Sequence, residues 1–400
     1  MKVLMVHNYY GSAAPSGENE VFEAEINLLR QHGNKVYEFT RHSDEIRSKG
    51  HWGTLKGAIS TPWNQFSCNA MRKAVIERGP DVVHVHNTFP LLSPSVFYSI
   101  EKPVARVLTL HNYRLFCPAG IPMRKGTVCT KCLDTRSSWP SIKYGCYRNS
   151  RVATLPIALS ISLHRMLRTW VNKVDAFIAL SEFQQELMVK SGLPEKKVYV
   201  KPNFYPGTPP VKPWQDRKPY VVFVGRLSKE KGVVTLLQAW RKWGTKAPEL
   251  RLVGDGGLRS ELERLARNLP VRFLGQVTSS EAQEQIACSR LLILPSEWFE
   301  GFPMVIREAF ALGTPAAVSS IGPLPAIVKN GKSGIVFNPS DSDSLRYVVE
   351  RAWQNPEMLE RLGKRARIEY EENYNDKTNY KILSDIYRKA LSFSKTKISK

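Results

Sequence analysis

Short apolar runs alternate along the chain with longer segments that repeat their apolar residues at helical spacing. Asn19 to Gln31 is predicted to be a helix, because Val21, Phe22 and later apolar residues share one face and Gly33 can terminate it. The apolar runs of the first half predict strands at Lys2 to Val6, Lys35 to Phe39, Val82 to His86, Val104 to Leu110, Ala176 to Leu180 and Val198 to Lys201. This alternation predicts parallel sheets covered by helices on both faces.

A proline-rich segment interrupts the alternation near the middle of the chain. Pro202 to Pro213 contains five prolines and one glycine, which excludes a helix or a central strand and predicts a linker. Beyond it, strands are predicted at Tyr220 to Val224, Leu250 to Val253, Val271 to Leu274 and Leu291 to Leu294. After Asn355 the pattern is helical and highly charged, and Lys395 to Lys400 is expected to fray.

Two domains are expected, because 400 residues exceed what one hydrophobic core usually supports. The first is predicted to span residues 1–205 and to carry a cysteine-containing insertion at about 114–150. The second is predicted to span residues 206–375, and a C-terminal helix over 376–400 is expected to pack back on the first domain. Both are predicted to be Rossmann-like α/β domains with doubly wound parallel sheets.

Positive charge is concentrated in one part of the first domain. The chain carries 58 Lys and Arg against 36 Asp and Glu, and the stretch from Lys102 to Lys173 carries 13 basic residues against one acid, Asp134. One interpretation is a solvated basic face. The other is a helix on an anionic membrane surface, formed by the mostly apolar segment Leu155 to Trp170 with Pro156 in its first turn. The sequence leaves both interpretations open.

The sequence shows no pattern for crossing a membrane or for binding nucleic acid. No run of about 18 uncharged apolar residues occurs, and the apolar run Met1 to Val6 is too short for a signal peptide. Helix-turn-helix, zinc-finger and RNA-binding strand signatures are absent. We therefore expect a cytoplasmic protein without a nucleic-acid partner, peripheral on the inner face of the membrane if the helix interpretation holds.

The turns after the second domain's strands carry the strongest chemical signal, because open parallel sheets bind ligands at the carboxyl ends of their strands. The first strand runs into Gly225 to Gly232, where glycines allow a tight loop and Arg226 and Lys231 can flank one bound anion. Arg can fork across two phosphate oxygens while Lys acts as a point charge, so the pair suits a diphosphate. The later turn Gly254 to Gly257 is expected to be structural.

Two glutamates follow the fourth strand of that domain. Because Pro303 is acceptable only near a helix start, a helix is predicted to begin there and to end at Gly313. Glu300 then lies in the loop before the helix and Glu308 inside it, so both can face one cleft and accept hydrogen bonds from sugar hydroxyls. Backbone N–H groups before the helix offer donors to the same ligand, those of Gly301 and Phe302.

The order of these motifs resembles the signature of retaining family 4 glycosyltransferases. It reads Gly-Arg-Leu, two residues, Glu-Lys-Gly, then Gly-Asp-Gly, then two glutamates separated by seven residues, and the likeness in layout covers nearly the whole chain. The resemblance implies the GT-B fold, in which two Rossmann-like domains face a central cleft. It implies that Arg226 and Lys231 bind the donor diphosphate, that Glu300 contacts the transferred sugar and that Glu308 contacts the ribose. It also implies that the base lies near the turn that contains Val277.

The first domain carries two further points of resemblance. The family usually has two adjacent glycines near the diphosphate in the loop after the first strand, and here Ser16 replaces the first while Gly17 remains as a donor contact. His111 resembles the family's active-site histidine, although Asn112 stands in place of the usual Asp. The resemblance implies that His111 lies beside the donor sugar at the reacting centre.

Two histidines of the first domain are expected to share one face of a strand. His84 and His86 are two residues apart in the strand predicted from Val82, so their side chains point the same way. Metal binding by such a pair is conceivable, and the family resemblance favours packing or lining of the cleft.

Four of the six cysteines cluster in the basic insertion. Cys129 and Cys132 have the spacing that lets two thiolates hold one metal ion, and a structural zinc site is expected with Cys117 and Cys146 as the other ligands. The alternative is four reduced thiols, as is usual in a cytoplasmic protein. Cys68 and Cys288 are expected to be ordinary buried residues.

These features together predict a glycosyltransferase. It would move a hexose-type sugar, with retention and without a catalytic metal, from a nucleotide-diphosphate donor to a glycan or lipid-linked acceptor in surface polysaccharide or glycolipid synthesis. One alternative is a nucleotide-sugar epimerase on the same architecture. The other is a non-catalytic glycan- or membrane-binding protein, which the presence of Arg226, Lys231, Glu300 and Glu308 disfavours.

Overall fold

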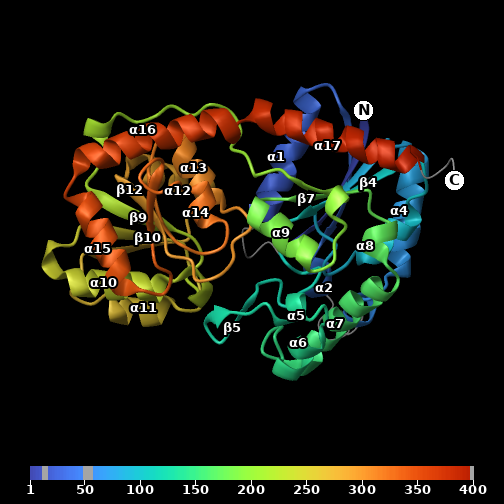
Figure 1. Ribbon diagram of the computed structural model, residues 1–400, viewed down its shortest axis with the longest axis horizontal. Helices are drawn as coiled ribbons and strands as arrows, with labels where there is room; N and C mark the ends of the chain where they lie inside the picture. The colour runs from blue at the N-terminus through green and yellow to red at the C-terminus, as the bar shows by residue number, and fades with distance from the viewer. Residues whose placement is uncertain (11–16, 48–56, 397–400) are drawn as a thin grey trace. The chain divides into compact units, whose positions relative to one another are not determined.

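The computed structural model describes residues 1–10, 17–47 and 57–396 and divides into two compact units (Figure 1). The N-terminal unit comprises Met1–Pro122, Thr130–Pro202 and Asn379–Lys400. The C-terminal unit comprises Asn203–Thr378 together with the short segment Met123–Cys129. Each unit is built around its own sheet, so each can be described by itself.

The sheet of the N-terminal unit has six parallel strands in the order β2-β1-β3-β4-β7-β8. They are β1 (Lys2–Tyr9), β2 (Lys35–His42), β3 (Val82–Val85), β4 (Ala105–Leu110), β7 (Ala176–Ala179) and β8 (Val198–Val200). All six predicted strands are therefore confirmed. Neighbouring parallel strands need crossover connections, and helices supply them.

The helices of this unit include both chain-terminal ones. They are α1 (Gly17–Gln31), α2 (Asp44–Arg47), α4 (Gln65–Arg78), α5 (Lys131–Asp134), α6 (Trp139–Tyr144), α7 (Arg151–Met166), α8 (Thr169–Asn172), α9 (Glu182–Lys190) and α17 (Asp376–Thr396), with 3-10 turns η1 (Pro94–Ser99) and η2 (Glu195–Lys197). Helices α1 and α17 lie side by side on the sheet (Figure 1), and Phe22 and Ile26 of α1 share one hydrophobic core with Leu383 and Tyr387 of α17. The end of the chain thus completes the core that its beginning starts.

One helix differs from its predicted bounds. The segment predicted as Leu155 to Trp170 is a helix over Arg151–Met166, and a separate short helix begins at Thr169. The start is earlier because the Ser150 side chain caps the helix by accepting a hydrogen bond from the Ala153 amide. Pro156 therefore lies inside the helix and not in its first turn, and Arg168 with φ 51° breaks the chain direction before the next helix.

The sheet of the C-terminal unit is also parallel, in the order β11-β10-β9-β12-β13-β14. The four predicted strands are confirmed as β9 (Tyr220–Val224), β10 (Glu249–Val253), β11 (Val271–Gly275) and β12 (Leu291–Leu294), and two strands that were not predicted follow, β13 (Ala316–Ser319) and β14 (Gly334–Phe337). A two-stranded hairpin, β5 (Met123–Arg124) and β6 (Thr127–Val128), groups with this unit.

Helices cover both faces of this second sheet. They are α10 (Val233–Trp243), α11 (Arg259–Leu265), α12 (Ser279–Cys288), α13 (Met304–Ala311), α14 (Leu324–Ile327), α15 (Ser342–Trp353) and α16 (Pro356–Asn373), with 3-10 turns η3 (Trp214–Asp216), η4 (Lys229–Lys231) and η5 (Gly244–Lys246). Residues 201–213, which the structure describes throughout, contain no helix or strand, as their prolines predict. The predicted α/β class with two Rossmann-like sheets is confirmed.

Candidate functional site

The strand order of the C-terminal unit reverses between two central strands. β9 has β10 on one side and β12 on the other. The chain leaves β9 toward β10 and leaves β12 toward β13, so the connections after β9 and β12 run in opposite directions along the sheet. Such a reversal opens a crevice at the carboxyl ends of the strands, where open α/β sheets bind their ligands. Arg226 and Lys231 follow β9, and Glu300 follows β12, so the sequence-predicted residues lie at this switch point.

Glycines hold the loops at the switch point close together. Gly232 has φ 67°, and a Cβ atom built there would lie 1.8 Å from the Pro295 carbonyl oxygen. A Cβ on Gly254 would lie 2.1 Å from the Gly225 carbonyl oxygen, and one on Gly256 would lie 2.4 Å from that of Leu227. The turn that contains Gly254 and Gly256 therefore packs against the loop after β9, which supports its structural interpretation.

Glu300 is the centre of a hydrogen-bonded cluster at this point. Its Oε1 atom accepts bonds from Lys231 Nζ at 2.7 Å, Ser296 Oγ at 2.6 Å and Trp298 Nε1 at 3.0 Å. Glu300 is only 4% exposed, so these donors replace water around the carboxylate. The Lys231 ammonium also lies 5.5 Å from the centre of the Trp298 ring. The cluster fixes one cation and one anion in contact.

Arg226 is arranged differently from Lys231. Its side chain is 63% exposed and lies 3.2 Å from Glu230 Oε1, a carboxylate that also accepts a bond from Ser228 Oγ. An exposed ion pair of this kind contributes at most about 1 kcal/mol, so the guanidinium can exchange its partner at little cost. The loop thus offers one fixed and one movable positive charge.

Glu308 lies inside α13, as predicted, and is 6% exposed. Its Oε1 atom is 3.9 Å from a guanidinium nitrogen of Arg307, so the structure brings Lys231 to Glu300 and places Glu308 beside a different cation. The loop before α13 is held by Asn203, whose side-chain amide donates to the Phe302 carbonyl at 3.2 Å. The predicted helix is confirmed, and Gly313 ends it with φ 67°.

For the other residues predicted to contact the sugar donor, the structure shows where some of them lie in the fold. Val277 follows β11, and Thr278 forms a capping box with Glu281 that starts α12 directly after it. Gly17 is the first residue of α1, whereas Ala14 to Ser16 lie outside the described residues. The contacts of Val277, Gly17, Gly301 and Phe302 with a donor stay predictions.

The N-terminal unit holds a second group of chemically capable residues. His111 directly follows β4, and its Nε2 atom lies 2.9 Å from Nδ1 of His86. The two histidines line a cavity of about 80 Å³ together with Asn112, Arg114 and apolar side chains. Burial lowers the pKa of His111 well below its usual value, and the neighbouring His86 lowers it further, so His111 is neutral at neutral pH. A catalytic role for His111 stays a prediction.

The clustered cysteines lie in both units. Cys117 and Cys132 are buried in the N-terminal unit with Cys146 near them, and Cys129 falls in the segment that groups with the C-terminal unit. Burial, and next the neighbouring Cys132, raise the pKa of the Cys117 thiol to about 12. The four-cysteine zinc site stays a prediction. Cys68 and Cys288 are buried, as expected.

Several residues at these sites were not singled out from the sequence. Ser296 and Trp298 bind Glu300, but nothing in a loop sequence tells which side chains turn inward. Glu25 and Lys201 form a fully buried ion pair behind His86. A signal for Glu25 did exist, because it lies three residues after Phe22 and directly before Ile26 on the apolar face of the predicted helix.

Two parallel-sheet α/β units, each with its polar residues at the carboxyl ends of its strands, define a protein of the GT-B class. Residues 17–206 match the family described as Glycosyltransferase Family 4, and residues 208–369 match the family described as Glycosyl transferases group 1. The chain belongs to the group 1 glycosyltransferases.

Relatives and solved structures agree with this assignment. The chain is 25% identical over 409 residues to sulfoquinovosyl transferase SQD2 of Arabidopsis thaliana, covering 96% of this chain and 72% of that protein. It is 30% identical over 331 residues to spore coat protein SA of Bacillus subtilis (strain 168), covering 77% and 78%. Its fold is similar to sucrose-phosphate synthase of Thermosynechococcus elongatus, with a TM-score of 0.69, 18% identity and coverage of 98% and 99%.

A second solved structure, Anabaena Alr3699/HepE in complex with UDP and glucose, has a TM-score of 0.62 and 17% identity, with coverage of 96% of this chain and 99% of that one. At this identity the likeness establishes the fold alone.

Substitution of Gly232 by alanine is expected to destabilise the C-terminal unit. The left-handed conformation costs an alanine about 1–2 kcal/mol, and the Pro295 carbonyl adds a collision with backbone that cannot move aside. We expect a total loss above about 2 kcal/mol in urea unfolding. The matched control is Gly331→Ala, at φ 72° with no atom within 4 Å of the added Cβ. Equal losses in the two variants would contradict the packing of the loop against Pro295.

Acid is expected to destabilise the N-terminal unit through a buried histidine. Burial lowers the pKa of His7 from 6.5 to about 4, although its hydrogen bond to Asn19 opposes the shift. Between these values the unfolded chain binds a proton that the folded chain excludes. Stability should therefore fall as pH falls, by about 1.4 kcal/mol per pH unit for this group.

Urea unfolding at a series of pH values between about 7 and about 5 measures this slope. The His7→Gln variant should show a shallower pH dependence of stability than the wild type. A slope that is the same in wild type and His7→Gln would show that His7 takes no part.

Proposed function

We propose that this glycosyltransferase moves a hexose-type sugar from a nucleotide-diphosphate donor to a glycan or lipid-linked acceptor, with retention of the anomeric configuration. The observation that carries the proposal is the contact between Lys231 and Glu300 at the switch point, with the exposed Arg226 on the same loop. A diphosphate needs positive charge and a sugar needs hydrogen-bond acceptors, and this contact places one of each side by side.

The donor diphosphate would bind to Lys231 and Arg226. Lys231 now neutralises Glu300, and a diphosphate carries more negative charge than one carboxylate, so the ammonium can bridge both. Arg226 leaves a weak exposed partner and can fork across two phosphate oxygens. These two cations would stabilise the leaving phosphate without a divalent metal. The leaving phosphate would itself take the proton of the acceptor hydroxyl.

The sugar, ribose and base of the donor would bind to the other predicted residues around this cluster. Glu300 would bind hydroxyls of the transferred sugar, Glu308 those of the ribose, and the turn that contains Val277 would hold the base. Gly301, Phe302 and Gly17 would offer backbone donors, and His111 would lie beside the donor sugar at the reacting centre. A solved neighbour holds UDP and glucose, and one relative is a sulfoquinovosyl transferase, which supports a nucleotide-sugar donor and an acceptor in glycolipid or polysaccharide synthesis.

An epimerase on the same fold would use the same donor and no acceptor. The two functions separate in one assay, because an epimerase converts or releases the nucleotide sugar when it is incubated alone. Consumption of a donor only when a glycan or lipid-linked acceptor is added supports transfer.

Binding of nucleotide diphosphates is expected to raise the melting temperature of the wild type and to depend on the cations of the loop after β9. A ligand at about 100 times its dissociation constant stabilises the folded state by about 2.7 kcal/mol. Arg226→Ala and Lys231→Ala should each abolish most of the shift. The matched control is Lys229→Ala, which removes an exposed cation from the same loop. A shift that survives in both site variants, or that is lost equally in the control, would refute this assignment of the site.

We also propose that helix α7 rests on an anionic membrane surface, as its sequence suggested. Four apolar side chains line its outer face, spaced by three, four and seven residues: Val152 is 82% exposed, Leu155 43%, Leu159 50% and Met166 73%. Trp139 of α6, which packs beside α7, is 70% exposed. An apolar stripe on the outside of a folded unit is typical of an interaction surface.

The charges around the stripe favour an anionic lipid surface over a protein groove. Lys143, Arg148, Arg151 and Arg168 are exposed on the same two helices and their flanks, and Asp134 is the one acid between Lys102 and Lys173. Basic residues at a lipid surface each contribute about 1 kcal/mol of attraction. None of the helices in the described ranges is long and apolar enough to span a bilayer, so the contact would be peripheral.

Loss of the apolar stripe is expected to weaken vesicle binding. Val152→Ser combined with Met166→Ser removes two exposed apolar side chains, and we expect affinity for phosphatidylglycerol-containing vesicles to fall on the order of tenfold or more in sedimentation. The matched control is Phe66→Ser combined with Ile76→Ser on α4, which removes side chains 74% and 75% exposed. Equal loss in the two double variants, or equal binding of wild type to pure phosphatidylcholine vesicles, would contradict a docking surface at α7.

A further inference from the structure

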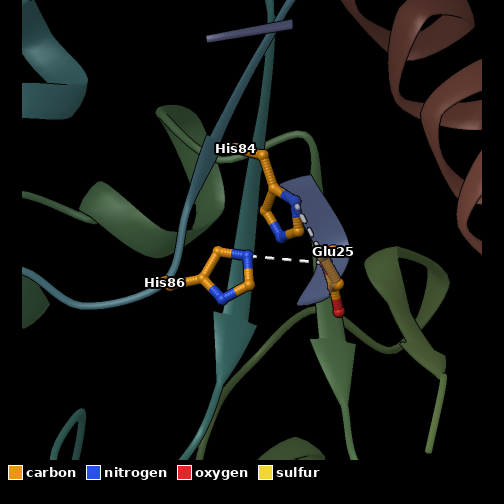
Figure 2. Close-up of side chains that lie close together, drawn as sticks. All are labelled: Glu25, His84 and His86. Carbon is orange, nitrogen blue, oxygen red and sulfur yellow. Dashed lines mark ion pairs between the residues drawn. The ribbon is translucent and has the colours of Figure 1, made fainter. Parts of the chain in front are cut away.

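A chain of buried polar groups lies behind His111 in the N-terminal unit. His84 and His86 project from the same side of their strand, and Figure 2 shows both imidazoles beside Glu25 of α1. Glu25 and His84 are fully buried and His86 is 3% exposed. Lys201 donates from Nζ to Glu25 Oε1 at 2.6 Å, so the order of groups is Lys201, Glu25, His86 and His111.

Glu25, His84 and His86 are the group within the described ranges whose ligand atoms could hold a metal ion. Two observations argue for another role. Both ring nitrogens of His84 already have partners, the hydroxyls of Tyr387 at 2.8 Å and Thr109 at 2.7 Å. The Lys201 ammonium supplies the positive charge that a buried carboxylate needs, and it would repel a metal ion at the same oxygen pair.

The charge of each group in the chain follows from its surroundings. Burial by itself would raise the pKa of Glu25, but Lys201 and then hydrogen bonding to His86 outweigh it and hold the pKa well below its usual value. Burial lowers the pKa of His84 and of His7, which approaches from β1, so both are neutral. Tyr387 of α17 keeps its proton because burial raises its pKa. Glu25 is therefore an anion that Lys201 neutralises, and His84, His7 and Tyr387 carry no charge.

A carboxylate only accepts hydrogen bonds, and this sets the protons along the chain. Glu25 Oε2 and His86 Nε2 face each other at 3.5 Å, and neither atom has a hydrogen-bond partner among the described residues. With Lys201 neutralising Glu25, an uncharged His86 carries its proton on Nε2, next to the carboxylate, and its Nδ1 is then an acceptor. The 2.9 Å contact then requires His111 Nε2 to donate, which leaves His111 Nδ1 without a proton.

We propose that Lys201, Glu25 and His86 are positioning residues that hold His111 in its neutral, Nε2-protonated form, so that it offers Nδ1 as an acceptor to a substrate hydroxyl. The use of Nδ1 by a sugar hydroxyl rests on the proposed function, whereas the tautomer does not. His111 is partly exposed and lines the cavity described above, so a hydroxyl can reach it. If His111 Nδ1 carried a proton, it would instead donate a hydrogen bond and select a substrate atom that only accepts one, such as a ring or carbonyl oxygen.

Two-bond ¹H–¹⁵N NMR spectra of protein labelled at histidine report the tautomer directly, because protonated and bare ring nitrogens have different shifts. The spectrum of a His111→Gln variant identifies the resonance. We expect His111 to be protonated at Nε2 at neutral pH in the protein without substrate. A His111 that is protonated at Nδ1, or at both nitrogens, would overturn the proposal.

Glu25→Gln tests the origin of the tautomer. Lys201 holds the amide oxygen at the Oε1 position, so the amide NH₂ must face His86 Nε2 and donate to it. His86 then carries its proton on Nδ1 and donates to His111, whose proton moves to its own Nδ1. We expect this switch in the spectrum. Glu20→Gln, at an exposed position of the same helix, should leave the spectrum of wild type unchanged. An unaltered His111 in a folded Glu25→Gln variant would refute the chain.

Kinetics separate this inference from the proposed function. In Glu25→Gln we expect kcat for transfer to fall on the order of 100-fold, because a wrong tautomer disables a correctly placed imidazole, with the thermal shift by nucleotide diphosphates unchanged. Wild-type kcat together with a switched tautomer would show that transfer does not use Nδ1. Absence of transfer in wild type together with the expected tautomer would refute the proposed function and leave the proton order standing. If Glu25→Gln does not fold, the wild-type tautomer alone decides.

Discussion

The parallel direction of the strands is the constraint on which both units depend. Each strand must be reached by a crossover that covers a face of the sheet, so the central strands are buried and most of their side chains are apolar. Most polar side chains with chemical roles then lie where a strand ends, and His84 within β3 is an exception whose ring nitrogens are both hydrogen-bonded. In the C-terminal unit Arg226, Lys231 and Glu300 stand there. In the N-terminal unit His86 and His111 stand there, and the order of the strands alone brings each group together.

The central strands were readable from the sequence because they are buried. Tyr220–Val224 and Leu291–Leu294 are continuous apolar runs bounded by turn residues, and the structure has them at the predicted residues. Ala316–Ser319 and Gly334–Phe337 were not predicted, because alanine and glycine make short runs that carry little strand signal. The start of α7 was misjudged because the signal came from Pro156, whereas the cap on Ser150 decides where the helix begins.

The candidate site was predictable as a set of residues but not as a set of contacts. The motif order identified Lys231 and Glu300, and spacing placed them after strands whose ends converge. Their direct contact, and the donors that Ser296 and Trp298 add, depend on side-chain directions in a loop, which no periodicity encodes. The pairing of Glu25 with Lys201 spans 176 positions of the chain. The local sequence pattern can show that a charged residue lies on an apolar face, but it cannot show which distant residue neutralises that charge.

Helix α17 affects the order in which the two units can fold during synthesis. Leu383 and Tyr387 of α17 belong to the core of the N-terminal unit, and the Tyr387 hydroxyl is bonded to His84 on β3. Everything from Asn203 to Thr378 belongs to the other unit. During synthesis the N-terminal sheet is therefore made first but must wait for α17 to leave the ribosome before its helical layer closes. Until then an apolar surface beside the buried histidines stays open to water, and the unit that is translated second is the one that can finish folding first.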